Sequence, residues 1–271
     1  MSAKSLVVRP VSSKVAAETI RALHYSGKVV QNSQVSLGVF FHGRLEGAMQ
    51  FGPPLDKRKI GGLVRGSEWH NFCELNRLAF SEALPRNSES RALGVAFRLL
   101  AKHAPQVKWC VSFSDATQCG DGTIYRAAGF VLTGIKQNNQ IWAAPTGERF
   151  SRTSLTDGRS KQQQQQQARQ VVSRTTMTKG KHVLSDGASS MKDLHAAGWR
   201  PLPGYQFRYI RFLDPSWRSR LTVPEIPFSE IPAECRMVRG VRRPVEGAGV
   251  QPAAGGADPT SPLHDHPNGV P

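Results

Sequence analysis

The chain has 271 residues, a formal net charge of +16 at pH 7 and 39% hydrophobic residues, which suits a folded core with polar appendages. No apolar run approaches the ~18 residues of a membrane-spanning helix, and none of the four cysteines forms a Cys-x-x-Cys pair. These features argue against a membrane protein and predict free thiols in a reducing cytoplasm. So large a positive charge favours a polyanionic partner, with nucleic acid ahead of a membrane surface.

The N-terminal part of the chain predicts a strand, a helix and a β-hairpin. Residues 5–9 are apolar and strand-like, and residues 14–24 repeat apolar side chains at the spacing of one helical face. Gly27 can supply the left-handed turn that follows this helix. Two strands are predicted at residues 35–41 and 45–51, joined by a His-Gly-Arg turn. A sheet is therefore expected to begin early in the chain.

Three consecutive cations, Lys57, Arg58 and Lys59, lie in a predicted surface loop after the hairpin. Such a patch is often only solvated. Beside a net charge of +16, however, it favours contacts with the phosphates of DNA. We therefore predict that these three residues bind DNA.

The stretch from Glu74 to Phe130 predicts a strand, a polar turn, a helix, a second strand and a short helix. Residues 74–80 and 109–115 are short and apolar-rich, as expected of strands. Between them, residues 92–100 place apolar side chains at the spacing of one buried helical face.

The start of this central helix is a candidate anion site. A helix N-terminus presents unpaired backbone N–H groups and the positive end of the helix dipole, which together favour phosphate. The side chains gathered there can also donate hydrogen bonds to an anion; they are Arg86, Asn87, Ser88, Ser90 and Arg91. The simpler alternative is that Asn87 or Ser88 only caps the helix and the arginines are solvated.

This order of elements resembles the acyl-CoA core of the GNAT family of N-acetyltransferases. It consists of a strand, a helix, a second strand and a short helix that ends in Tyr125-x-x-x-Gly129-Phe130. The resemblance implies an α/β fold whose mixed, mostly antiparallel central sheet is flanked by helices. It also implies that acetyl-CoA places its pyrophosphate at the N-terminus of the central helix and its thioester near Tyr125. The chain departs from that family in one respect, because residues 86–91 replace its usual glycine-rich pyrophosphate loop.

Four segments resemble, more specifically, the Mom family of phage DNA-modification proteins. They are Phe51-Gly52-Pro53-Pro54, Glu74-Leu75-Asn76-Arg77, Leu84-Pro85-Arg86-Asn87-Ser88-Glu89-Ser90-Arg91-Ala92-Leu93 and Gln118-Cys119-Gly120-Asp121-Gly122-Thr123-Ile124-Tyr125. The resemblance is close over residues 20–136 and resumes near residues 204–240. It implies an enzyme that uses acetyl-CoA to convert adenine in phage DNA to N6-methylcarbamoyl-adenine, which protects the DNA from host restriction endonucleases. The implied setting is the host cytoplasm, with double-stranded DNA as partner, iron as a further cofactor and a homodimer as one option.

The same resemblance brings six residues into a candidate active site, and they are His24, Tyr25, Arg77, Ser90, Asp115 and Tyr125. Of these, His24 and Asp115 are the candidate iron ligands, since imidazole and carboxylate suit iron. From the residues alone, His24 could equally be a helix-terminal dipole partner and Asp115 a loop cap. Arg77 needs a partner if it is buried. Asp115 is expected to supply it, because Glu74 should lie on the opposite strand face.

The composition divides the chain into four parts. Residues 1–145 form the expected GNAT-like core, and residues 204–240 add a returning strand and the C-terminal part of that core. Residues 146–203 contain six consecutive glutamines and predict a disordered basic insertion, either an arm on DNA or a plain linker. Residues 241–271 predict a disordered tail.

Two rival functions stay open at this point. One is an ordinary acetyl-CoA-dependent N-acetyltransferase acting on a protein or small amine, and the other is a non-enzymatic DNA-binding protein. DNA binding alone fits both the modification enzyme and the binder. The modified base would separate them.

Overall fold

The structure is a computed structural model that describes residues 2–24, 26–116, 120–151, 191–238 and 241–242. In chain order its elements are η1 (Ala3–Ser5), β1 (Val7–Pro10), α1 (Ser13–Leu23), β2 (Val35–Phe41), β3 (Arg44–Gly52), α2 (Lys57–Gly61), β4 (Phe72–Phe80), α3 (Ser88–His103), β5 (Trp109–Asp115), α4 (Thr123–Ala127), β6 (Val131–Ala143), β7 (Arg149–Ser151), α7 (Met191–Ala196), β8 (Arg200–Phe212), η2 (Pro215–Arg220), η3 (Phe228–Glu230), η4 (Ala233–Cys235), β9 (Met237–Val238) and β10 (Val241–Arg242).

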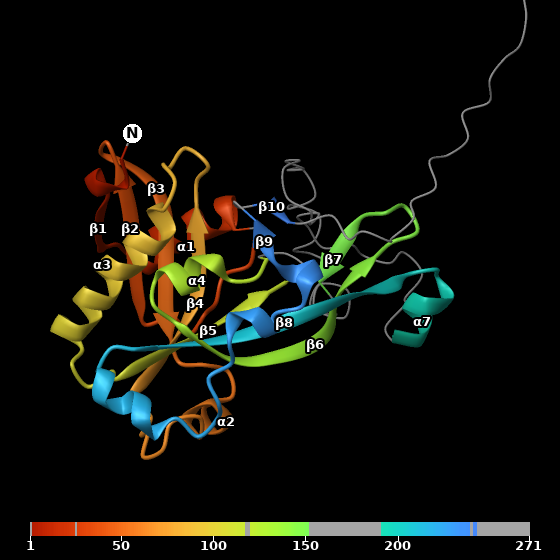
Figure 1. Cartoon of the computed structure of the whole chain (residues 1–271). Coiled ribbons are helices and arrows are strands. Elements are labelled where there is room, and N and C mark those ends of the chain that lie inside the picture. The colour runs from red at the N-terminus through yellow and green to blue at the C-terminus, as the bar shows by residue number, and fades with distance from the viewer. Residues whose placement is uncertain (1, 25, 117–119, 152–190, 239–240, 243–271) are drawn as a thin grey trace, which may run out of the picture.

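One sheet organises these elements (Figure 1). Its strand order is β1-β2-β3-β4-β5-β8-β6-β7, and β9 and β10 form a separate two-stranded sheet. Neighbouring strands of the large sheet are antiparallel except β4 and β5, which run parallel. This mixed, mostly antiparallel sheet with helices packed against it confirms the predicted α/β fold class.

The sheet opens at its one parallel step. β4 and β5 pair only at the start, where Phe72, Cys73 and Glu74 face Trp109, Cys110 and Val111. Both strands continue beyond these pairs, to Phe80 and Asp115, and β5 pairs with β8 along its full length. The ends of β4 and β5 are therefore separated, which leaves room between the two strands for other groups.

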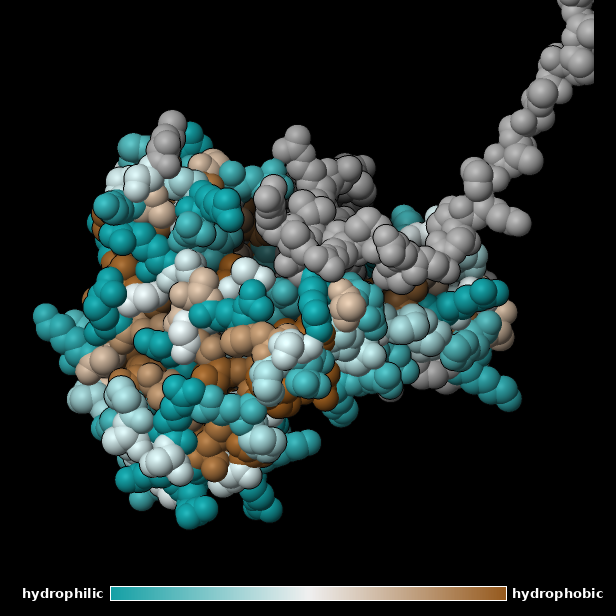
Figure 2. All heavy atoms as spheres, viewed as in Figure 1, coloured by the Kyte–Doolittle hydropathy of each residue, from teal (hydrophilic) through white to brown (hydrophobic). Residues whose placement is uncertain are grey.

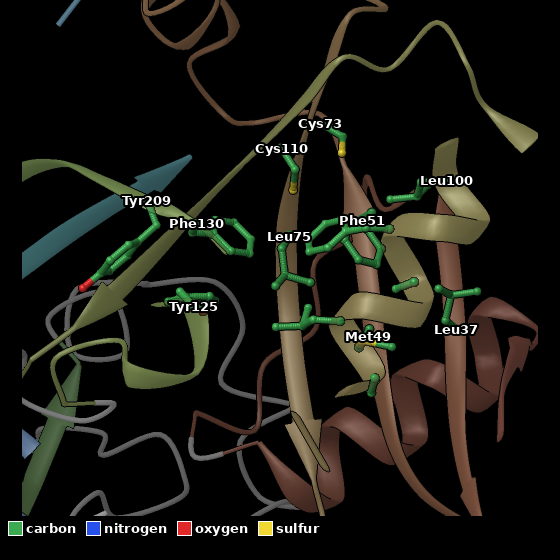
Figure 3. Close-up of a cluster of buried hydrophobic side chains, with 14 of the residues drawn as sticks. Leu37, Met49, Phe51, Cys73, Leu75, Leu100, Cys110, Tyr125, Phe130 and Tyr209 are labelled. Atoms are coloured by element: carbon green, nitrogen blue, oxygen red, sulfur yellow. The ribbon is translucent and has the colours of Figure 1, made fainter. Parts of the chain in front are cut away.

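The largest hydrophobic cluster lies between the sheet and the helices α3 and α4 (Figure 3). Met49, Phe51 and Leu75 of the sheet pack with Leu93 and Phe97 of α3 in this cluster. A smaller cluster, in which α1 contributes Ala16 and Ile20, packs on Ala48 and Ala79. Because successive side chains of a strand point to opposite faces, Met49 and Ala48 identify α3 and α1 as lying on different sides of the sheet.

The face opposite α3 also carries α2 and the segment after it. Ile60, Leu63 and Val64 are buried there against Trp109 of β5, whose ring stacks on Phe72 with 4.8 Å between the centroids. Lys57, Arg58 and Lys59, which were expected in a loop, form the first three residues of the short helix α2 instead. Its start is capped by Asp56, whose Oδ1 accepts a hydrogen bond from the backbone N–H of Lys59 at 3.0 Å.

Two further corrections concern the ends of elements. Asn87 precedes α3 but does not cap it through its side chain, since its backbone is left-handed with φ of 69°. Within residues 146–203, where a disordered insertion was expected, the structure describes β7, α7 and the start of β8. The glutamine run lies outside the described residues, as does the predicted tail from residue 243 onwards.

The surface in the same view is mostly hydrophilic at its rim, and apolar side chains gather towards the middle of this face (Figure 2). Among the described residues, no helix is both long and apolar enough to cross a membrane.

Candidate active site

A cationic groove lies at the N-terminus of α3. Its volume is about 560 Å³, and we call it the α3 groove; its lining residues are Ser2, Ala3, Lys4, Arg86, Asn87, Ser90, Arg91, Gly94, Arg98 and Ala127. Four of these are cations, which come from the N-terminal segment, the turn before α3 and the exposed side of α3. Together with the N–H groups of the first helical turn, they make the groove suited to a multiply charged anion.

Four of the five residues predicted to hold the phosphates of CoA lie in this groove. Arg86, Asn87, Ser90 and Arg91 line it, whereas Ser88 does not: Ser88 is 1% exposed and its Oγ donates to the carbonyl of Pro85 at 2.5 Å.

The cations Lys4 and Arg98 of the groove were missed. Arg98 had a signal, because it lies two helical turns after Arg91 and so shares its face. Lys4 had none. It reaches the groove through tertiary packing, where its backbone carbonyl accepts a hydrogen bond from Arg91 at 3.2 Å.

A second cavity lies where β4 and β5 diverge. Its volume is about 700 Å³, and we call it the sheet pocket; it is lined by Pro54, Leu55, Asp56, Lys59, Ile60, Glu74, Leu75, Asn76, Arg77, Phe113, Asp115, Gly134, Ile135, Lys136, Gln206 and Arg208. Arg77 and Asp115, both predicted for the active site from the Mom resemblance, thus line one cavity. A pocket of this size with both charges and apolar walls is typical of a small-molecule or base-binding site.

Glu74 also lines the sheet pocket, although it was expected on the face opposite Arg77. The reason is a β-bulge. Along β3 and β4, Gln50 pairs with Arg77 and the next residue, Phe51, pairs with Leu75, so that Asn76 is an extra residue in β4. The extra residue reverses the alternation of side chains, which places positions three apart on the same face.

Glu74 is the most perturbed carboxylate of the sheet pocket. Burial raises its pKa to about 7, against the lowering effects of the Arg77 charge and a hydrogen bond with Asn76. At neutral pH this carboxyl is therefore divided between its protonated and ionised forms. Such a group can accept or release a proton at little free-energy cost.

The two arginines of the sheet pocket, Arg77 and Arg208, are held in place mainly by backbone carbonyls. Arg77 donates from Nε to the carbonyl of Lys28 at 2.9 Å and from Nη1 to the carbonyl of Asn76 at 2.6 Å. Arg208 donates to the hydroxyl and the carbonyl of Thr133 at 3.1 and 2.6 Å, and burial lowers its pKa. Both guanidinium groups are thus fixed in orientation before any ligand enters.

A protein-family comparison decides the relationship of this chain, because the model described as the Mom protein family matches residues 5–230. The chain belongs to the Mom protein family. It is 35% identical over 136 residues to the methylcarbamoylase Mom of Escherichia phage Mu, and the match covers 50% of this chain and 56% of that relative. The chain thus spans little more than half the length of that relative.

Solved structures similar to this Mom family chain include several acetyltransferases. A GNAT family acetyltransferase from Elizabethkingia anophelis with acetyl-CoA bound is 11% identical, with 75% of this chain and 97% of that chain covered and a TM-score of 0.39. An IAA acetyltransferase from Bacillus cereus is 9% identical, with 77% and 99% covered and a TM-score of 0.41.

Two described residues expected from the Mom resemblance, His24 and Tyr125, line neither the sheet pocket nor the α3 groove. His24 follows α1, where its Nδ1 lies 2.8 Å from the Oγ of Ser26 and accepts a hydrogen bond from the N–H of Ser26. Tyr125 is 8% exposed and packs between Phe130 and Tyr209, with 5.2 Å between the ring centroids in each pair. Tyr25 lies outside the described residues.

The iron implied by the Mom resemblance has no complete ligand set in the described part of the chain. No group of three or more His, Cys, Asp or Glu side chains comes together there in a way that could hold a metal. His24 and Asp115 are thus not joined by a third ligand of these types among the described residues. The segment after His24 does approach the pocket, since the carbonyl of Lys28 accepts a hydrogen bond from Arg77.

The cations of α2 adjoin the sheet pocket. Lys57, Arg58 and Lys59 are all exposed, and Lys59 lines the pocket itself. Lys57 places its Nζ 5.2 Å from the ring centroid of Trp69, a residue that is 67% exposed. Of this basic, partly aromatic surface, Lys59 thus belongs to the sheet pocket, whereas Lys57, Arg58 and Trp69 line a separate hollow.

Proposed function

We propose that this chain is a DNA-modifying transferase that attaches a methylcarbamoyl group to N6 of adenine in double-stranded DNA. In this proposal the α3 groove binds acetyl-CoA and the sheet pocket binds the target adenine, while the nitrogen of the methylcarbamoyl group, which the acetyl group lacks, comes from a second, nitrogen-containing co-substrate. The family membership and the name of the phage Mu relative support the reaction. The observation that carries the assignment of the site is the meeting of Glu74, Arg77 and Asp115 in a pocket that Lys59 of α2 also lines.

The α3 groove suits the phosphates of CoA by charge. Lys4, Arg86, Arg91 and Arg98 supply four positive charges, and the first turn of a 16-residue helix adds backbone N–H donors. Phosphate oxygens accept such charge-assisted hydrogen bonds strongly. Because these groups lie at the surface, we expect the affinity for CoA to fall as the salt concentration rises.

Glu74 is the residue we assign to proton transfer. Any new bond to N6 of adenine replaces a hydrogen of the amino group, so a proton must leave. With its pKa raised to about 7, the ionised form of Glu74 can accept that proton and later release it to water.

Arg77 and Asp115 are assigned to binding and orientation. Arg77, held by the carbonyl of Lys28, presents a fixed cation beside Glu74. Asp115 ends β5 in the same pocket, where its carboxylate can accept a hydrogen bond from the amino group of adenine.

Protection from restriction follows from the position of the new group. In the major groove, adenine is recognised through its N6 amino donor and its N7 acceptor. A substituent on N6 removes one donor hydrogen and occupies space that a nuclease side chain would need. We therefore propose that the modified DNA resists endonucleases that contact adenine in the major groove.

The test is mass spectrometry of nucleosides digested from the DNA of cells that express the full chain. We expect deoxyadenosine heavier by the methylcarbamoyl mass with the wild-type chain. Glu74→Gln should lower its yield by about 10²- to 10⁴-fold, the usual contribution of a general base. Asp115→Ala should lower it strongly, and Arg44→Ala, which changes a side chain that is 84% exposed, should leave it unchanged.

Two outcomes would contradict the proposal. Unmodified adenine, both in cells and with purified protein supplied with DNA and acetyl-CoA, would refute the reaction. If the purified protein then acetylated amines, the chain would be an ordinary N-acetyltransferase. If the Glu74→Gln variant modified DNA fully, the proposed reaction would stand and the proton-transfer role of Glu74 would be refuted.

A further inference from the structure

Large hydrophobic side chains are rarely exposed in the described part of this chain. The four that are exposed are Val7, Val15, Leu55 and Trp69. Two of them flank the basic helix α2 in the sequence: Leu55, which is 96% exposed, precedes it, and Trp69, which is 67% exposed, follows it. Exposure of single apolar residues is common in itself. What sets Leu55 apart is that it also lines the sheet pocket.

Leu55 stands on a well-anchored backbone. Pro53 and Pro54 precede it, and their rings fix the backbone angle φ at both positions. Pro54 is buried just before it, and Asp56 just after it caps α2 through the N–H of Lys59.

The far end of α2 is anchored as well. Ile60 is 7% exposed and packs in the cluster that contains Trp109. Beyond the helix, the N–H of Arg65 donates to the carbonyl of Arg220 at 2.8 Å. Because its backbone is anchored on both sides, Leu55 can contact a partner without a large loss of conformational freedom.

The surroundings of Leu55 select the kind of partner. Lys57, Arg58 and Lys59 follow it within one helical turn, and Lys57 lies over the Trp69 ring. A protein partner with an apolar surface would have to bury these cations. A nucleic acid duplex instead offers phosphates to the cations and an apolar stack of bases to the leucine.

The position of the sheet pocket creates a need for such a residue. A base inside a duplex cannot reach a pocket in a protein unless it leaves the stack, and the loss of stacking and pairing opposes this step. Apolar side chains that enter a base step can stabilise the opened duplex. Leu55 lies at the rim of the pocket that would receive the base.

From this arrangement we propose that Leu55 enters the base stack of duplex DNA in the space left by the adenine that occupies the sheet pocket, while Lys57 and Arg58 bind the flanking phosphates. The proposal rests on the proposed function, since it requires DNA as the substrate. It adds a positioning residue that makes no contact with the reacting atoms. Its effect should therefore be large on duplex DNA and absent where no base pair must be opened.

The first experiment compares duplex DNA with denatured DNA as substrates for the purified full chain, supplied with acetyl-CoA and the small-molecule fraction of the expressing cells as the source of the remaining co-substrates, with modified deoxyadenosine measured by mass spectrometry. Leu55→Ala should lower the yield on duplex DNA at least tenfold and leave the yield on denatured DNA unchanged. Val7→Ala is the matched control, because Val7 is 56% exposed on β1 and lines neither the sheet pocket nor the α3 groove. Equal yields of wild type and Leu55→Ala on duplex DNA would overturn the proposal, and so would equal losses on both substrates.

A second experiment needs no chemistry by the enzyme. Permanganate oxidises thymines that are unstacked, so it reports the thymine left without its adenine partner. The wild-type chain should raise permanganate reactivity of bound duplex DNA, and Leu55→Ala should return it to the level of free DNA at equal occupancy. Bound DNA that shows no rise with the wild type overturns the role of Leu55. A rise in permanganate reactivity that Leu55→Ala abolishes, without any modified adenine, would instead refute the proposed reaction and retain the role of Leu55 in the base stack.

Discussion

Replacing Glu74 by glutamine should remove much of the pH dependence of stability between pH 5 and pH 8. Burial raises the pKa of Glu74 from its ordinary value of 4.5 to about 7 in the folded protein. Between these two values the folded state holds a proton that the unfolded state has lost, so stability falls as the pH rises through this range. Since one pKa unit corresponds to 1.36 kcal/mol, the loss reaches about 3 kcal/mol above pH 7, and about 2.5 kcal/mol of it develops between pH 5 and pH 8.

The measurement is urea unfolding of the full chain at pH 5, 6, 7 and 8, followed by tryptophan fluorescence. The free energy of unfolding of Glu74→Gln, relative to wild type, should rise by about 2.5 kcal/mol from pH 5 to pH 8. Glu18→Gln removes an exposed carboxylate of α1 and serves as the control for the loss of one charge. If the difference between Glu74→Gln and wild type is constant across this range, the carboxyl is not desolvated and the reasoning is refuted.

Three further predictions concern the turn before α4 and the two ligand surfaces. Gly122→Ala should destabilise the fold more than Gly43→Ala in thermal melting: the two glycines have φ of 74° and 78°, but only at Gly122 would a Cβ meet an aromatic ring, at 2.6 Å. Gly43→Ala should cost only the backbone strain, about 1 kcal/mol, and equal losses would contradict the close contact. Arg91→Ala should raise the Kd for CoA roughly tenfold in titration calorimetry while Arg44→Ala leaves it unchanged, because only the first removes a charge from the α3 groove. Arg58→Ala should reduce the slope of log K against log salt for duplex DNA by about 0.9, and an unchanged slope would mean that Arg58 touches no phosphate.

The sequence determined most elements of the core because their signals are local. Apolar spacing and the flanking proline predicted the central helix that the structure forms at Ser88–His103, and a short apolar run predicted the strand Trp109–Asp115. The cationic start of α3 could be read in the same way, since neighbours in sequence are neighbours on a helical turn. The resemblance to the Mom family added Arg77 and Asp115 as candidate site residues, and both line the sheet pocket.

Only the tertiary structure decided which side chains share a cavity. Glu74 joins Arg77 because β4 bulges at Asn76, and a bulge depends on the pairing with β3 rather than on the alternation within β4. Leu55 reaches the rim of the same pocket because the α2 segment folds back onto the face of the sheet opposite α3. Strand alternation and helical periodicity are properties of one segment, whereas a pocket is made by segments far apart in the chain, and their register is set by packing.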